Sequence, residues 1–281
     1  MATRADAVSQ PVCFSLDGEK VEALPGETIL QSAKRLGREI PHLCYKEGLR
    51  PDGNCRACMV EIAGERVLAP ACCRSPSEGM QVDTLGERVR QAQQMVLELL
   101  RSDMSRTAYT LESELGYWSD QLGVAETRFP ARDQPKADLT HPAIAVNLDA
   151  CIQCTRCLRA CREEQVNNVI GYAHRGPASS IVFDLEDTLG ESSCVACGEC
   201  LQVCPTGALM PAGDVGLESP DKSVDSICPY CGVGCQLTYH VRDNRILHIS
   251  GRDGPANSGR LCVKGRYGFD YAHHPGRLTV P

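Results

Sequence analysis

The chain has 281 residues, a mass of 30.5 kDa and a net charge of −7 at pH 7. This length suits two or three small domains rather than one large core, and the acidic balance argues against nucleic acid as a partner. No apolar run approaches ~18 residues and the first residues carry no signal-like segment, so we expect no membrane partner, no export and a cytoplasmic location.

The first predicted elements form a strand, a turn, a second strand and a helix. Alternating apolar residues predict a hairpin over 12–24 that turns at Asp17 and Gly18. The helical spacing of Ile29, Ala33 and Leu36 then predicts a helix over 28–36. Further strands are expected at 59–62 and 66–68, and an amphipathic helix at 86–101.

The rest of the chain alternates polar linkers with cysteine-rich segments. Residues 128–142 are rich in Pro and charge and are expected to be a linker. Two segments with the same cysteine spacing follow, 43 residues apart, at 151–161 and 194–204. A second polar linker is expected at 211–226, and a last hairpin at 236–242 and 245–250 about Asp243 and Asn244.

The 18 cysteines lie in tight groups separated by long stretches without cysteine, which favours metal clusters over disulfide staples. Both repeated segments have the spacing C-x2-C-x2-C-x3-C, and Pro205 follows the second. In bacterial ferredoxins three cysteines of such a run hold one cluster and the fourth crosses to the other. Zinc ribbons use cysteine pairs at wider separation and fit poorly. The spacing predicts one [4Fe–4S] cluster on Cys151, Cys154, Cys157 and Cys204, and another on Cys161, Cys194, Cys197 and Cys200.

The first cysteine group does not have the plant-type ferredoxin spacing, so resemblance assigns it. Residues 41–44 and 52–58 resemble the [2Fe–2S] domain shared by complex I, iron hydrogenases and some formate dehydrogenases. The resemblance implies a β-grasp domain with a [2Fe–2S] cluster on Cys44, Cys55, Cys58 and Cys72. The neighbouring Cys73 could compete for the fourth place, and Cys13 is expected to be a small buried side chain.

The last cysteine group is Cys228, Cys231, Cys235 and Cys262. A structural zinc site is an open alternative for these four thiols. Residues 228–235 and 261–265 resemble the [4Fe–4S] domain of molybdopterin oxidoreductases. In that family a lysine just after the last ligand lies between cluster and pterin, which implies a role as electron relay for Lys264. We expect none of the seven histidines to be a metal ligand.

From residue 12 to residue 281 the chain resembles the N-terminal iron–sulfur region of the α subunit of cytoplasmic NAD-dependent formate dehydrogenase, most specifically at 147–154, 163–167 and 205–209. The resemblance implies an α+β chain that carries one [2Fe–2S] and three [4Fe–4S] clusters. The expected order is a β-grasp [2Fe–2S] ferredoxin domain at 11–84, a helical segment and linker at 85–142, a two-cluster bacterial-ferredoxin-like domain at 143–212, a linker at 213–226, and the start of a small β-rich [4Fe–4S] domain at 227–281.

The chain departs from the family in two places. Many relatives hold a further cluster through one His and three Cys, but 102–141 contains no Cys, so Tyr109, Leu115 and Trp118 within 106–122 are expected to fill that space. The large domain that holds a molybdenum or tungsten bis-pterin guanine dinucleotide does not follow residue 281. We expect a truncated chain rather than a natural small subunit, because the last domain would otherwise leave an apolar face uncovered.

These features predict part of an oxidoreductase that contains no substrate-converting centre of its own. Electrons would pass between a molybdenum or tungsten pterin site, where formate is oxidised or carbon dioxide reduced, and a flavin- and NAD-binding β subunit with iron–sulfur clusters. One alternative is the iron–sulfur subunit of an NAD-linked hydrogenase diaphorase. An alternative of another class is a zinc-binding scaffold without electron flow.

Overall fold

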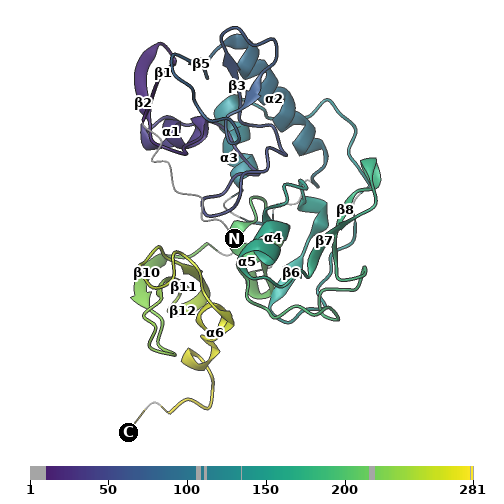
Figure 1. The fold of residues 1–281 in the computed structure, drawn as a ribbon. Coiled ribbons are helices and arrows are strands. Elements are labelled where there is room, and N and C mark those ends of the chain that lie inside the picture. The colour runs from purple at the N-terminus through teal and green to yellow at the C-terminus, as the bar shows by residue number, and fades with distance from the viewer. Residues whose placement is uncertain are drawn as a thin grey trace, which may run out of the picture. The chain divides into compact units, whose positions relative to one another are not determined.

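The computed structural model describes residues 11–105, 109–110, 113–133, 135–214, 219–278 and 280. Expectations about the first ten residues, and about parts of 106–122 and 213–226, lie outside the described residues. The chain divides into two compact units, Met1–Ser102 with Glu114–Pro130, and Asp103–Ser113 with Ala131–Pro281 (Figure 1). Each unit mixes short helices with small sheets, as the predicted α+β class requires.

The first unit contains a five-stranded sheet in the order β2-β1-β5-β3-β4, with β5 parallel to β1. The predicted first hairpin is present, and its turn residues Asp17 and Gly18 have φ of 52° and 84°, as a tight turn between antiparallel strands requires. The strand expected at 66–68 was wrong: the strand lies at Ala69–Pro70, where Ala69 pairs with Val60 and is buried, while Val67 stays exposed. The strands are β1 (Val12–Leu16), β2 (Glu19–Ala23), β3 (Met59–Ile62), β4 (Ala69–Pro70) and β5 (Gln81–Asp83).

Three helices complete the first unit: α1 (Ile29–Arg35), α2 (Glu87–Ser102) and α3 (Glu114–Leu122). Helix α1 begins with a capping box, in which Thr28 accepts from the backbone of Gln31 and the Gln31 side chain accepts from the backbone of Thr28. Helix α3 was not predicted as a helix, although Leu115 and Trp118 are buried in it, as expected of this segment. The ring of Trp118 lies 5.8 Å from that of His42, which places α3 beside the loop of Cys44.

The second unit builds both cysteine runs into the same local structure. In each run a short helix carries the third cysteine: α4 (Arg156–Arg159), continued by a π-turn at Ala160–Glu164, and α5 (Glu199–Val203). The residues just before these helices have positive φ at equivalent positions, 65° at Thr155 and 74° at Gly198. The sequence repeat is therefore also a repeat of backbone conformation. Two strand pairs accompany the runs, β6 (Ile144–Val146) with β9 (Leu209–Pro211), and β7 (Ile170–Ala173) with β8 (Ser180–Phe183).

The C-terminal module of this unit is a three-stranded sheet, β10-β11-β12, followed by α6 (Val263–Tyr267). Strands β11 (Gln236–Arg242) and β12 (Arg245–Gly251) form the predicted hairpin. All of strand β10 (Lys222–Ile227) except its last residue lies in the predicted linker 213–226. The strand is polar because it lies at the sheet edge and most of its residues are exposed, so its sequence resembles that of a linker. In the described part of the chain, no helix combines the length and apolar character needed to cross a membrane.

Candidate metal centres

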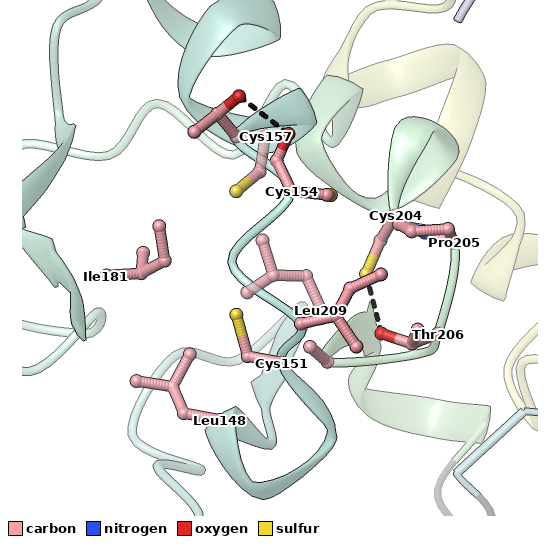
Figure 2. Close-up of a pocket in the computed structure, with 12 residues that line it drawn as sticks. Leu148, Cys151, Cys154, Cys157, Ile181, Cys204, Pro205, Thr206 and Leu209 are labelled. Atoms are coloured by element: carbon pink, nitrogen blue, oxygen red, sulfur yellow. Dashed lines mark hydrogen bonds between the residues drawn. The ribbon is translucent and has the colours of Figure 1, made fainter. Parts of the chain in front are cut away.

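A cavity in the second unit is lined by four cysteines that come from both repeated runs (Figure 2). Cys151, Cys154 and Cys157 belong to the first run, and Cys204 is the last cysteine of the second. About 370 Å³ of space, part of it open to solvent, is left unfilled by protein atoms here. Its other lining residues are mostly apolar: Leu148, Ile152, Thr155, Ile181, Pro205, Thr206, Ala208 and Leu209. These four thiols are the set that the sequence spacing predicts for one [4Fe–4S] cluster.

Backbone N–H groups point at the sulfur atoms in both runs. The N–H of Gln153 donates to Sγ of Cys151, and at the equivalent place the N–H of Ala196 donates to Sγ of Cys194, both at 3.4 Å. Gln153 and Ala196 each have φ of 53°, which turns these amides inward. Amide donors stabilise negative charge on sulfur, so both runs are arranged to hold thiolates.

The cavity disfavours bare thiolates because it is apolar and its thiols repel one another. Burial raises the pKa of Cys151 to about 11 and that of Cys154 to about 12, and it also raises the pKa of Cys157. Bound iron would supply the positive charge that replaces these protons. The donor set, the apolar walls and the inward amides therefore fit an iron–sulfur cluster.

The second predicted ligand set of the repeat is also partly buried. Cys161 and Cys200 are buried, whereas Cys194 and Cys197 are half-buried. Cys161, Cys194 and Cys200 belong to one apolar cluster with strands β6 to β9. Burial raises the pKa of Cys200, with a further contribution from repulsion by Cys197. The side chains of these four cysteines thus share the same part of the fold.

In the first unit the four predicted ligands are in direct contact. The thiol of Cys44 is hydrogen-bonded to those of Cys55 and Cys72, and the thiol of Cys58 to that of Cys72. The backbone N–H of Cys44 also donates to Sγ of Cys55 at 3.3 Å. The hydrogen bond from Cys55 lowers the pKa of Cys44 to about 2, and the same bond raises the pKa of Cys55. The four thiols therefore titrate together, which suits a group that binds metal with proton release.

The structure favours Cys72 over Cys73 as the fourth residue of this group. Cys72 is fully buried and bonded to the neighbouring thiols, whereas Cys73 is exposed. Sγ of Cys73 lies 3.5 Å from that of Cys72, so it borders the group from outside. Cys13, expected to be buried, is only half-buried in β1.

In the C-terminal module the four predicted ligands lie at one end of the sheet and on the loop before α6. The N–H of Cys228 donates to the carbonyl of Cys235 at 2.9 Å, which closes the loop between these two residues. Burial, and repulsion by the thiols of Cys228, Cys231 and Cys262, raise the pKa of Cys235. Cys231 and Cys262 are exposed, which makes this the most open of the cysteine groups. Lys264, the expected relay, is exposed in the first turn of α6.

Within the described ranges, no three Cys, His, Asp or Glu side chains are arranged around the position of a single metal ion.

Sequence motifs did not identify the charged and phenolic side chains buried next to the cysteine runs. Arg156 and Arg159 in the first run are 1% exposed, and Glu199 in the second is 3% exposed. Arg266 and Tyr267 of α6 lie against the second run. When the two runs are aligned, Arg156 and Glu199 occupy the same position. This repeated charged position is a sequence signal that could have identified the buried charges within the runs. The sequence holds no comparable signal for Arg266 and Tyr267.

Three sequence families match the chain in the predicted order. Residues 9–87 match a 2Fe-2S iron-sulfur cluster binding domain, residues 150–208 a 4Fe-4S dicluster domain, and residues 221–274 the molybdopterin oxidoreductase Fe4S4 domain. The predicted succession of three iron–sulfur domains is confirmed.

Relatives match over almost the whole chain. A component of an NADH-quinone oxidoreductase of Rhizobium meliloti is 35% identical over 95% of this chain, and a putative formate dehydrogenase of Staphylococcus haemolyticus is 28% identical over 98%. The chain spans about a third of the length of these relatives, 32% in both cases. The crystal structure of an NAD+-reducing [NiFe]-hydrogenase in the H2-reduced state superimposes with a TM-score of 0.65 and 27% identity, over 71% of this chain and 87% of that one.

Proposed function

Because three iron–sulfur domain families match the chain in the predicted order, we propose that it conducts electrons through four clusters. One [2Fe–2S] cluster is assigned to the first unit and three [4Fe–4S] clusters to the second. The ligand sets are Cys44, Cys55, Cys58 and Cys72; Cys151, Cys154, Cys157 and Cys204; Cys161, Cys194, Cys197 and Cys200; and Cys228, Cys231, Cys235 and Cys262.

The observation that carries this proposal is the cavity that gathers cysteines from both runs. Cys204 lies 43 residues after Cys161, its counterpart in the first run, yet it lines the same cavity as Cys151, Cys154 and Cys157. This crossing is a property of two-cluster ferredoxins, and neither a disulfide scaffold nor a pair of independent zinc ribbons requires it.

The first unit supports a β-grasp assignment for the [2Fe–2S] domain. Its sheet places β1 and β5 side by side and parallel in the middle, with the β1–β2 hairpin on one side and β3 and β4 on the other. Helix α1 packs against β2, and residues of both belong to one apolar core with Cys58 and Cys72. We also propose a cytoplasmic location, because clusters held by cysteine thiolates suit a reducing compartment.

The donor and acceptor of these electrons are proposed from the relatives. We assign the chain to a formate dehydrogenase, with electrons from a molybdenum or tungsten bis-pterin site entering at the Cys228 group past Lys264. A flavin- and NAD-binding partner would receive them, as the names of the NADH-linked and NAD-reducing relatives suggest. Substrate conversion would take place at that pterin site, on a further domain or on a partner subunit.

Metal analysis of anaerobically purified protein tests the cluster assignment. The expected result is about 14 irons per chain, matching acid-labile sulfide and negligible zinc. About 10 irons with one zinc would reduce the Cys228 group to a structural site and remove the argument for a pterin enzyme. A colourless protein rich in zinc would instead support the scaffold alternative.

The similarity to an NAD+-reducing hydrogenase supports a second candidate, the iron–sulfur subunit of a hydrogenase-linked diaphorase. The match to the molybdopterin oxidoreductase domain at 221–274 counts against it. Metal analysis of the complex that copurifies with the native protein separates the two. Molybdenum or tungsten supports the formate dehydrogenase, and nickel supports the hydrogenase.

A further inference from the structure

Two consecutive residues of helix α6 lie next to ligands of two different proposed clusters. A Cβ added at Gly265 would lie 3.5 Å from Sγ of Cys228 in the C-terminal module. The next residue, Arg266, is 5% exposed, and its Nε donates to the backbone carbonyl of Cys197 in the second run at 3.3 Å. The helix therefore joins the C-terminal cysteine group to the second run of the repeat.

Charged and polar contacts stabilise the packing of α6 against the second run. The guanidinium of Arg266 donates to Oε1 of Gln202 at 2.8 Å and lies 4.0 Å from the carboxylate of Glu199. Arg260, in the loop before α6, lies 3.5 Å from the same carboxylate. Glu199 is buried, so the two arginines neutralise a charge that would otherwise be unfavourable there.

The second run has a glycine where α6 covers it. Gly198 has φ of 74°, and an added Cβ would lie 2.7 Å from the hydroxyl of Tyr267 and would also overlap the side chain of Arg266. The absence of a side chain at this position lets the phenol approach the backbone between Cys197 and Cys200.

The hydroxyl of Tyr267 is a buried donor without an acceptor among the described residues. Its ring packs against the apolar cluster that contains Cys161, Cys194 and Cys200. A buried hydroxyl without a partner costs free energy, so an acceptor is expected at this place. Sulfur is the acceptor that a cluster on these cysteines would provide, because protein donors commonly bond to cluster and ligand sulfurs.

We propose that the hydroxyl of Tyr267 donates a hydrogen bond to a sulfur of the [4Fe–4S] cluster held by Cys161, Cys194, Cys197 and Cys200, and thereby raises its reduction potential. The inference rests on the ligand sets of the proposed function. Reduction adds one negative charge to the cluster, and a donor to sulfur stabilises the more negative state. The C-terminal module thus adjusts the potential of the cluster in the neighbouring domain, and Arg266 holds the phenol in position.

The test is a redox titration of the chain and of its Tyr267→Phe variant, followed by electron paramagnetic resonance. We expect one of the three [4Fe–4S] signals to shift to lower potential while the iron content stays the same. Tyr271→Phe is the matched control, because Tyr271 belongs to the same module but is 50% exposed. It should leave all potentials unchanged.

A second measurement detects the hydrogen bond itself. In the reduced wild-type chain, electron–nuclear double resonance should detect a strongly coupled exchangeable proton on one [4Fe–4S] cluster, lost in D2O and absent from Tyr267→Phe. Unchanged potentials in Tyr267→Phe, or an equal shift of all three signals, would overturn the inference while leaving the four clusters in place. A wild-type chain far below about 14 irons would instead refute the proposed function on which it rests.

Discussion

The two best-defined cysteine sites hold their thiols in different ways. In the first unit Cys44 is hydrogen-bonded to Cys55 and Cys72, and Cys58 to Cys72, so the four sulfurs form one contact group. In the cavity of the second unit burial raises the pKa values of Cys151, Cys154 and Cys157, and repulsion between neighbouring thiolates adds to this. In the first unit the four sulfurs contact one another, whereas in the second unit the sulfurs line a cavity.

This difference matches the size of the cluster proposed for each site. A two-iron core binds its four thiolates in two close pairs, whereas a four-iron core places each thiolate at a separate corner. The spacing of cysteines along the sequence did not reveal this in the first unit, because it matches no standard ferredoxin run. The contact between thiols in the folded chain agrees with the two-iron cluster proposed for this unit.

The largest expected effect comes from removing a cysteine that crosses between the runs. Cys204→Ala deletes one corner of the cavity site, and we expect loss of one [4Fe–4S] cluster, so that iron falls from about 14 to about 10 per chain. Iron analysis and paramagnetic resonance measure the loss. The [2Fe–2S] signal should remain, because its ligands lie in the other unit.

Matched variants test the crossing itself. Cys151→Ala should remove the same signal as Cys204→Ala, and Cys161→Ala should remove the other one. If Cys204→Ala instead removed the same signal as Cys194→Ala, each run would hold its own cluster and the comparison of the two sites would rest on the wrong ligand set.

A smaller loss is expected in the first unit. Cys72→Ala should remove about two irons and the [2Fe–2S] signal, since Cys72 is buried and bonded to Cys44 and Cys58. Cys73→Ala should retain both, because Cys73 is exposed. Iron content and the visible absorption spectrum measure both variants. Loss of the signal in Cys73→Ala but not in Cys72→Ala would reverse the assignment.

Removing a positive charge near the cavity site should change the reduction potential of the cluster proposed there without changing its iron content. Arg156 lies between Cys154 and Cys157 in the sequence and is 1% exposed. The charge of Arg156 acts on Cys154, and a unit charge within about 10 Å of a cluster at an effective dielectric constant of ~20 is worth on the order of 2 kcal/mol, or about 90 mV for one electron. Arg156→Gln should therefore lower the potential of this cluster by about that amount in a redox titration. Arg156→Lys, which keeps the charge, should restore most of it.

The smallest expected effect concerns stability, through an ion pair at helix α1, which is bonded to the loop of Cys72. The guanidinium of Arg35 holds the pKa of Glu27 at about 2, below its ordinary value of 4.5. Glu27 lies just before α1, whose first N–H groups donate to the carbonyls of Arg74 and Ala71 on either side of Cys72 and Cys73. We expect Glu27→Gln to lower the free energy of unfolding at pH 7 by about 1 kcal/mol, since solvent screens part of the interaction.

The depressed pKa of Glu27 also predicts how the difference in stability between wild type and Glu27→Gln varies with pH. A carboxyl with a depressed pKa in the folded chain contributes its stability fully above pH 4.5, and the contribution is lost as the pH falls toward about 2. Urea unfolding of wild type and Glu27→Gln should therefore converge over that range. Glu47→Gln is the control, because the pair of Glu47 with Lys34 on the same helix is well exposed and should contribute little. A constant difference across this pH range would contradict the role of the charge.

Much of the local structure followed from periodicity and turn residues. The hairpins at Asp17 with Gly18 and at Asp243 with Asn244, and helix α2, are present close to the positions predicted. The spacing of the two runs also predicted which four cysteines line the cavity. These features depend on neighbouring residues or on a repeated pattern, which a single sequence contains.

Features that depend on tertiary contacts were not predictable. Strand β10 has polar residues, and its strand conformation depends on antiparallel pairing with β11. The hydrogen-bonded contact of Cys44 with Cys55 and Cys72 depends on loops brought together by the fold. Tyr267 is one tyrosine among eight, and only the position of α6 distinguishes it from the others.

The glycine at position 198 has a consequence for the history of the repeat. The equivalent residue of the first run is Thr155, which adopts the same left-handed conformation with a side chain. A chain with its two runs exchanged would keep every cysteine in place, but a threonine would stand where Arg266 and Tyr267 leave no room for a Cβ. If the runs arose by duplication, the copies have since specialised: one accepts a docked helix and the other does not, so the two halves are no longer interchangeable.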